Sequence, residues 1–376
     1  KFQGKCFAMW MAMLQNLVRV KVVDCHRCDQ LPMLGHLPHL TVARIKGMDN
    51  VTCIGIEFYG LQNCINSNVT SGDSSAAVRV SFPSLRKLTL ARLYNLEEWM
   101  EAGEIDGPLL RLKSRLNIFP CLEELVIEDC PVLKRIPGHF PSLKRLYICE
   151  LNDSVALEKM SRGLSSLSEL KLWGIGGPKI ELVLEQLLRG NSASLREVVI
   201  IGCSQLKKLP TDCLELCTFL TSLRLEDCTS LDSVPNLQSL TMLDELCIGG
   251  CWQLKKLPTD CLELCTSLIS LRLEDCTSLD SVPNLQSLTM LDELCIGGFC
   301  PELDYFPWPC PAASLRTLWL HGWGKLKSLP HQLQHLPPPL LDALVYTSLW
   351  WIGVSPGVAG QSLRSPTSVY KGLPEA

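Results

Sequence analysis

Cysteine and histidine are the residues of this chain with the greatest potential for chemistry. The chain has 20 cysteines and 7 histidines among its 376 residues. Cys25 and Cys28, spaced C-x-x-C, could supply half of a zinc site, but no second C-x-x-C pair completes a tetrahedral set. Cys130, Cys203 and Cys228 recur at the same place in a repeated phrase, where a cysteine serves as a small buried hydrophobic residue. We therefore expect no metal site.

Three further pairs are spaced four residues apart, which puts both members on one face of a helix. They are Cys213 with Cys217, Cys261 with Cys265, and His331 with His335. No acidic partner accompanies them in a pattern that would activate a nucleophile, and no G-x-S-x-G elbow occurs. The sequence therefore predicts no catalytic residue and no cofactor site, and the chain is not expected to be an enzyme.

An internal repeat determines where the side chains that carry a function must lie. Residues Cys203–Gly250 match Cys251–Gly298 at 45 of 48 positions, and the phrase L-x-x-L-x-L/I-x-x-C occurs twice in succession, at Leu220–Cys228 and Leu243–Cys251. The repeating unit is therefore about 24 residues long, within the range of leucine-rich repeats. Anchoring each unit on the first apolar residue of its L-x-L strand gives twelve units, at Val20, Ala43, Leu88, Leu125, Leu146, Leu170, Val198, Leu223, Leu246, Leu271, Leu294 and Leu318.

The L-x-L alternation points two aliphatic side chains inward and the residue between them outward. Successive short strands then stack in parallel, while the Leu-Pro segments return along the outer wall. The pattern predicts an α/β leucine-rich-repeat solenoid, a horseshoe with a parallel β-sheet on its concave face and short helices, turns and loops on its convex face. We place the solenoid at residues 1–330, with loop insertions near 63–81 and 101–117, followed by an irregular tail at 331–376.

Charge is sorted along the predicted concave face. The formal net charge of −4 and pI near 6.0 provide no whole-molecule field that would attract nucleic acid. The last six repeats carry more acidic than basic residues. The first three repeats carry seven basic residues opposed only by Asp24, and these residues are Arg19, Lys21, Arg44, Lys46, Arg86, Lys87 and Arg92.

Several phrases resemble the leucine-rich-repeat region of plant intracellular nucleotide-binding disease-resistance proteins of the coiled-coil type. They include Met11–Leu17, Cys25–Pro38, Ile54–Gly60, Phe82–Leu88 and Leu93–Trp99. The resemblance covers roughly residues 9–330. It implies a cytoplasmic protein-recognition module of an immune receptor. No G-x-x-x-x-G-K-[ST] loop occurs, so a nucleotide site is expected only in a domain upstream of this chain.

The resemblance also implies two contacts. Early repeats would fold back on the receptor's own nucleotide-binding domain and contribute to autoinhibition, and we assign this role to the seven basic residues. Later repeats would bind a pathogen effector or a host guard protein. We expect this second surface to include the aromatic side chains, since these contribute much of the energy at interfaces. The residues are Tyr147, Trp173, Arg224, Glu226, Asp227, Arg272, Glu274, Asp275, Trp319 and His321.

Two other classes stay open. A secreted leucine-rich-repeat binding protein or inhibitor would suit the N-x-[ST] sequons at Asn50, Asn68 and Asn152, but this sequence lacks that class's corner asparagine and G-x-I-P turn. A ubiquitin-ligase substrate adaptor also places cysteine at the corner, but without the recurrent Leu-Pro ending. A membrane span is not expected, because the uncharged stretch 343–359 is short and contains Pro356.

Overall fold

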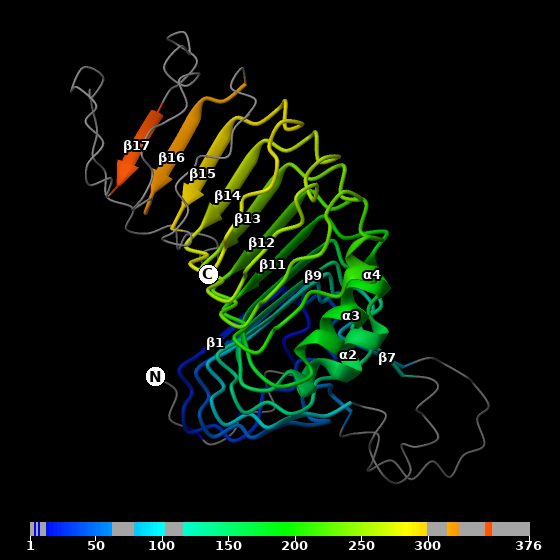
Figure 1. The fold of residues 1–376 in the computed structure, drawn as a ribbon. Helices are drawn as coiled ribbons and strands as arrows, with labels where there is room; N and C mark the ends of the chain where they lie inside the picture. Colours follow the sequence, from blue (N-terminus) through cyan, green and yellow to red (C-terminus); the bar gives the residue numbers. More distant parts are fainter. Residues whose placement is uncertain are drawn as a thin grey trace.

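One curved parallel sheet organises the chain (Figure 1). The computed structural model describes residues 4, 7, 13–61, 79–101, 116–298, 314–322 and 343–347. Within them, thirteen strands hydrogen-bond in chain order, apart from two small side pairs. The sheet strands are β1 (Arg19–Val23), β2 (Val42–Lys46), β5 (Lys87–Ala91), β8 (Glu124–Glu128), β9 (Arg145–Leu151), β10 (Glu169–Ile175), β11 (Glu197–Ile201), β12 (Ser222–Glu226), β13 (Glu245–Gly249), β14 (Ser270–Glu274), β15 (Glu293–Gly297), β16 (Thr317–His321) and β17 (Ala343–Thr347).

The register confirms the predicted repeat. Val20 pairs with Ala43, which pairs with Leu88, and the same row continues through the other anchors to Leu318. All twelve anchor side chains are buried. Because side chains alternate between the faces of a strand, fixing this row fixes which residues point out of the concave face.

Short helices cover part of the convex side. They are η3 (Ser154–Leu157), α2 (Glu158–Gly163), α3 (Ile180–Asn191) and α4 (Thr211–Leu214). In α3 the buried residues Ile180, Val183, Leu184, Leu187 and Leu188 recur every three or four positions, which gives the helix one apolar face against the core. In the part of the chain that the structure describes, no helix is long and apolar enough to cross a membrane.

The corner cysteines form a buried ladder. The Sγ atoms of Cys228, Cys251 and Cys276 donate to carbonyl oxygens of a neighbouring coil at 3.8–4.0 Å. Burial raises the pKa of the Cys130 thiol in the same position to about 12. These thiols therefore stay protonated and act as packing residues with weak hydrogen bonds.

Aromatic rings fill the coils next to the two insertions. Phe82 and Phe119 stack with ring centroids 4.9 Å apart, and Phe119 stacks on Phe140 at 5.7 Å. Trp99 contacts Phe119 edge to face at 6.0 Å. The described carboxyl ends of the two predicted insertions are the strands β4 (Arg79–Ser81) and β7 (Leu116–Ile118), which pair with each other. Apart from Glu101, the rest of both insertions lies outside the described residues. A second small pair joins β3 (Cys53–Ile54) and β6 (Glu98–Trp99).

The sheet extends one strand further than the repeat pattern predicts. β17 pairs in register with β16 and lies within residues 331–376, for which we expected an irregular tail. The L-x-L spacing does not identify this strand, because residues 343–347 read Ala-Leu-Val-Tyr-Thr. The other residues of that segment, including His331 and His335, lie outside the described part.

Each sheet strand from β1 to β16 has a residue with positive φ at its carboxyl end, directly after the strand or, in β9 and β10, at the next-to-last position. Its N–H continues the ladder, as where Gly250 N donates to Glu274 O at 3.0 Å. Asp and Gly dominate this corner because they adopt left-handed conformations at low cost. The corner residues are Asp24, Gly47, Arg92, Asp129, Glu150, Gly174, Gly202, Asp227, Gly250, Asp275, Gly298 and Gly322.

Gly250→Ala is expected to lower the free energy of unfolding by about 1–2 kcal/mol. Gly250 has a φ of +60°, and an added Cβ would lie 2.2 Å from Asp227 Oδ1. The neighbouring Gly249→Ala is the matched control, because its Cβ would meet nothing closer than 3.7 Å. Urea unfolding of both variants measures the difference, and equal midpoints would refute the strained corner.

Candidate functional site

Three parallel rows of outward side chains make up the concave face. The N-terminal row contains Lys87, Glu124, Arg145 and Glu169 at equivalent positions of successive strands. The middle row lies two residues further along each strand, and the C-terminal row two residues beyond that. The middle row runs Lys21, Arg44, Thr89, Val126, Tyr147, Lys171, Val199, Arg224, Cys247, Arg272, Cys295 and Trp319.

Four predicted basic residues form one uncompensated cluster on β1 and β2, which we name the basic patch: Arg19, Lys21, Arg44 and Lys46. Lys21 and Arg44 are paired neighbours in the middle row, and Arg19 and Lys46 flank them in the other two rows. Among the described residues, no carboxylate lies within 4.0 Å of these four cations. Arg19 and Lys21 are exposed, and Arg44 and Lys46 are half-buried. Like charges at this spacing repel one another and favour a negatively charged partner.

The other three basic residues are already paired. Arg86 Nη1 lies 3.1 Å from Glu123 Oε1, Lys87 Nζ lies 2.6 Å from Glu124 Oε1, and Arg92 Nη2 lies 2.8 Å from Asp24 Oδ1. The positive surplus expected over the first three repeats is therefore smaller than the residue count indicates. Glu123 and Glu124, at the start of the fourth repeat, neutralise two of these cations, and Arg92 lies at a strand corner rather than on the open face.

The middle of the concave face is a network of paired charges. Glu124 is buried between Lys87 and Arg145, whose Nη2 lies 3.2 Å from it. The Tyr147 hydroxyl donates to Glu169, and the Lys171 ammonium lies 5.4 Å from the Tyr147 ring centroid. Burial and the hydrogen bond to Glu169 raise the pKa of Tyr147, so this hydroxyl stays protonated and donates. Tyr147 is therefore held by its neighbours and presents only part of its ring.

The duplicated repeats place one charged motif twice on the face. Arg224 pairs with Glu226 at 2.6 Å, and Arg272 pairs with Glu274 at 3.0 Å. In the first copy the Cys247 thiol also donates to Glu226 at 3.1 Å. Asp227 and Asp275 do not belong to the rows, because they are exposed left-handed corner residues just beyond the strand ends. They can still contact a partner that overlaps this rim.

The structure spreads the predicted effector-binding set over the face from β9 to β16. Tyr147 and Trp173 lie on β9 and β10, whereas Trp319 and His321 lie on β16, six strands from β10. At the usual spacing of parallel strands this is a separation of about 29 Å. The charged residues of the set lie between these ends, on or directly after β12 and β14. A single partner must therefore be large to contact the whole set.

The sequence pattern did not identify Cys295 as a member of this surface. Its side chain lies in the middle row of β15, where it meets Glu274 and His321 from the neighbouring strands. The strand pattern L-C-I-G does show position 295 as an outward residue, and that is the only signal available before the register is known.

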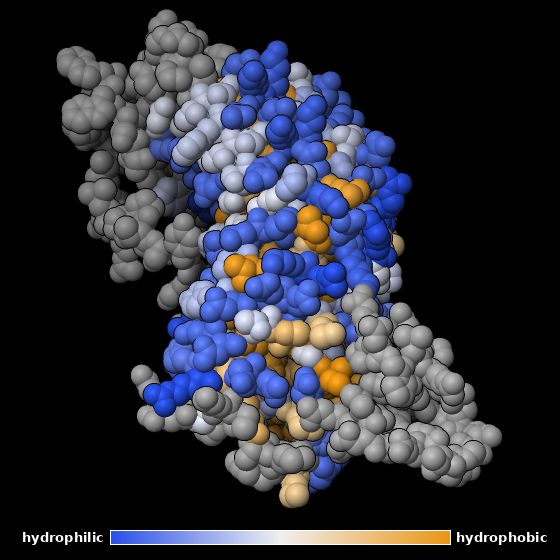
Figure 2. Space-filling view, turned by 90° about the horizontal axis from the view of Figure 1, so that it is seen from below, coloured by the Kyte–Doolittle hydropathy of each residue, from blue (hydrophilic) through white to orange (hydrophobic). Residues whose placement is uncertain are grey.

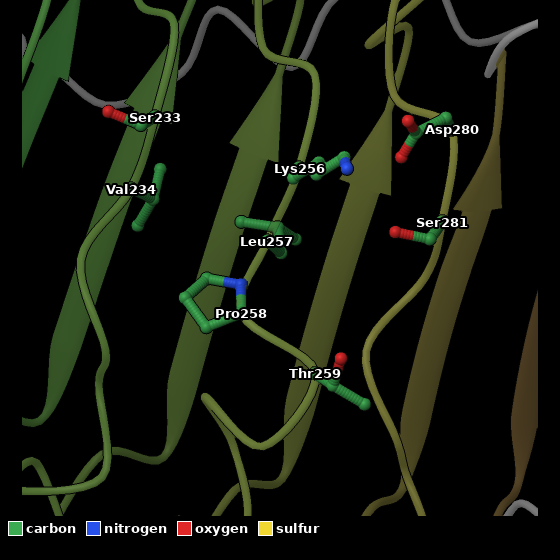
Figure 3. A pocket seen from close by; sticks show the side chains of 8 residues that line it. All are labelled: Ser233, Val234, Lys256, Leu257, Pro258, Thr259, Asp280 and Ser281. Atoms are coloured by element: carbon green, nitrogen blue, oxygen red, sulfur yellow. The ribbon is translucent and has the colours of Figure 1, made fainter.

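Outside the concave face, the described surface has few groups of residues that could bind a ligand. A pocket on the convex wall spans three successive coils, and the Lys256 side chain points toward the coil that carries Asp280 and Ser281 (Figure 3). It has no histidine, cysteine or aromatic lining residue. Figure 2 shows a mostly hydrophilic face on which apolar side chains are scattered among polar ones. Neither view presents the enclosed, largely apolar cleft typical of small-molecule sites.

Comparison with known proteins points to plant disease-resistance proteins. The R13L1/DRL21 leucine-rich-repeat family matches residues 1–48. Putative disease resistance RPP13-like protein 1 of Arabidopsis thaliana is 27% identical over 252 residues, which are 64% of this chain and 21% of that protein. Disease resistance protein RGA2 of Solanum bulbocastanum is 29% identical over 213 residues, which are 56% of this chain and 17% of that protein. The chain thus spans only a small part of the length of either relative.

Solved leucine-rich-repeat structures align at low sequence identity. A leucine-rich-repeat protein of Leptospira interrogans is 18% identical, with a TM-score of 0.47, and the alignment covers 89% of this chain and 79% of that protein's chain. The leucine-rich-repeat domain of the type III effector XopL is 16% identical, with a TM-score of 0.38, and the alignment covers 74% of this chain and 76% of that domain's chain.

Proposed function

We propose that this leucine-rich-repeat region, which is related to the coiled-coil nucleotide-binding disease-resistance proteins of plants, is the protein-recognition module of such a receptor. The observation that carries the proposal is the long concave sheet, whose outward residues include charged and aromatic side chains, with four basic residues together on β1 and β2. Such a face suits contact with another protein, because it offers area, charge complementarity and aromatic anchors rather than a closed pocket.

The two ends of the face have different roles in this proposal. The basic patch on β1 and β2 contacts an acidic surface of the receptor's own nucleotide-binding domain and helps to hold it inactive. The later strands, where Arg224, Arg272 and Trp319 lie among glutamates, bind a pathogen effector or a host guard protein. Both roles extend the relatives' disease-resistance function to this chain.

The cysteines support a reducing compartment and hence a cytoplasmic location. All sixteen cysteines that the structure describes are free thiols, and thirteen of them are buried. Disulfides form and persist in oxidising compartments and are rare in the cytosol. The described part of the chain therefore does not favour a secreted binding protein. The relatives named above do not favour a ubiquitin-ligase adaptor.

Trp319→Ala tests the recognition surface. Trp319 is half-buried in the middle row of β16, and an aromatic anchor of this kind contributes about 2 kcal/mol or more to an interface. The effector that triggers defence signalling by the full receptor in leaf tissue serves as the probe, and we expect its affinity to fall roughly 30-fold or more. Trp252→Ala is the matched control, because Trp252 is 57% exposed at the corner after β13, outside the three rows. Equal effects of the two substitutions would contradict the assignment.

A further inference from the structure

Three metal-binding side chains meet at the C-terminal end of the concave face. Glu274 on β14, Cys295 on β15 and His321 on β16 each place one donor atom within 4.8 Å of the other two. In the C-terminal row Gly297 stands between Glu274 and His321, so no side chain separates them. The parallel register therefore brings together three donors that lie in three different repeats.

The orientation of the donors suits coordination. His321 Nε2 lies 3.8 Å from Glu274 Oε2, and this buried nitrogen has no hydrogen-bond partner among the described residues. The other ring nitrogen, Nδ1, lies 3.8 Å from Asp275 Oδ1. In metal sites a carboxylate that accepts a hydrogen bond from the second ring nitrogen fixes the ring and its tautomer, and Asp275 would need to approach Nδ1 by about 0.8 Å to form that bond. Arg272 Nε holds the opposite oxygen of Glu274, Oε1, at 3.0 Å and leaves Oε2 directed toward His321.

One thiolate, one imidazole and one carboxylate are typical donors for zinc. With bonds of about 2.0–2.3 Å, a tetrahedral zinc ion holds its donors roughly 3.3–3.8 Å apart, so small side-chain rotations would complete the set. Three protein donors leave a fourth position for water or for a side chain of a partner. Because Glu274 and His321 are only partly buried, that position opens onto the concave face.

The duplication supplies an internal comparison. Arg224, Glu226 and Cys247 occupy the same places in the earlier copy as Arg272, Glu274 and Cys295 in the later one. In the earlier copy the place of His321 is taken by Glu274. The two copies therefore share the glutamate, the cysteine and the arginine, and only the later copy adds an imidazole.

We propose that Glu274, Cys295 and His321 form a binding site for a zinc-type divalent cation, with Asp275 orienting the histidine. The proposal does not rest on the proposed immune function. Zinc binds the thiolate form of cysteine, so coordination by Cys295 would release the proton of this thiol.

Titration of the full chain with Co²⁺ tests the site, because a thiolate bound to Co²⁺ gives a ligand-to-metal charge-transfer band. We expect one equivalent to produce this band and Zn²⁺ to displace it. Cys295→Ala and His321→Ala should each weaken binding by roughly 100-fold or more, and Asp275→Asn by roughly 10-fold. Far-ultraviolet circular dichroism confirms that each variant is folded.

Cys247→Ala is the matched control, since it removes the equivalent thiol from the copy that lacks the histidine, and its affinity should equal that of the unaltered chain. Two results would overturn the site. One is the absence of a charge-transfer band in the unaltered chain. The other is a band that Cys295→Ala and Cys247→Ala reduce to the same extent, which would show adventitious binding to cysteines in general.

Discussion

Phe119→Ala is expected to lower the free energy of unfolding by about 3–5 kcal/mol. Phe119 is 1% exposed and lies at the centre of the aromatic cluster, stacked between Phe82 and Phe140 and in edge contact with Tyr59 and Trp99. The substitution leaves a cavity that neighbouring coils cannot fill and removes several aromatic contacts at once. Urea unfolding followed by far-ultraviolet circular dichroism measures the loss.

Phe219→Ala is the control for this prediction. Phe219 is 43% exposed, and its only described ring partner is the guanidinium of Arg196 at 4.8 Å. The equivalent residue of the second copy is Ser267, so the fold already tolerates the loss of this ring. Its substitution should cost less than about 1 kcal/mol. A comparably small cost at Phe119 would show that the aromatic cluster does not hold these coils together.

Reversing the charge of the basic patch is expected to release the receptor from its resting state. The double substitution Lys21→Glu and Arg44→Glu places two negative charges on adjacent strands, in place of two cations that have no ion-pair partner among the described residues. Close charge pairs at interfaces couple by about 1.5–7 kcal/mol, so the affinity for the receptor's own nucleotide-binding domain should fall roughly 100-fold or more. Signalling without an effector, scored in leaf tissue, reports the outcome in the full receptor.

Arg86→Glu is the informative comparison. Arg86 belongs to the basic set that the sequence predicts, but its guanidinium is paired with Glu123. Its reversal should leave the resting state largely intact, because little of its charge is available to a partner. If Arg86→Glu activated the receptor while the double substitution on β1 and β2 did not, the assignment of the intramolecular contact to the basic patch would be wrong.

The repeat period was enough to predict the architecture and the register. A spacing of one coil between L-x-L strands requires successive strands to pair, and the two inward residues fix the face that each side chain takes. Val20 and Leu318, at opposite ends of the described anchors, lie in the row predicted for them. β17 is the exception, since its sequence does not repeat the leucine spacing.

The contacts between coils could not be predicted in the same way. Lys87 and Glu124 lie 37 positions apart in sequence, yet the parallel register makes them neighbours on adjacent strands despite the insertion between them. A count of charges within the early repeats therefore overestimated the positive surplus. The cluster of Glu274, Cys295 and His321 was missed for the same reason, because its spacing follows the coil length and matches no local ligand motif.

Sequencing the transcript that encodes this chain, together with the genomic region upstream of the codon for Lys1, tests the central claim most directly. The proposed function predicts a contiguous reading frame that encodes a nucleotide-binding domain with a G-x-x-x-x-G-K-[ST] loop, joined in frame to these repeats. A frame that instead begins with a secretory signal peptide directly before the repeats would contradict the account and assign the concave face to an extracellular partner.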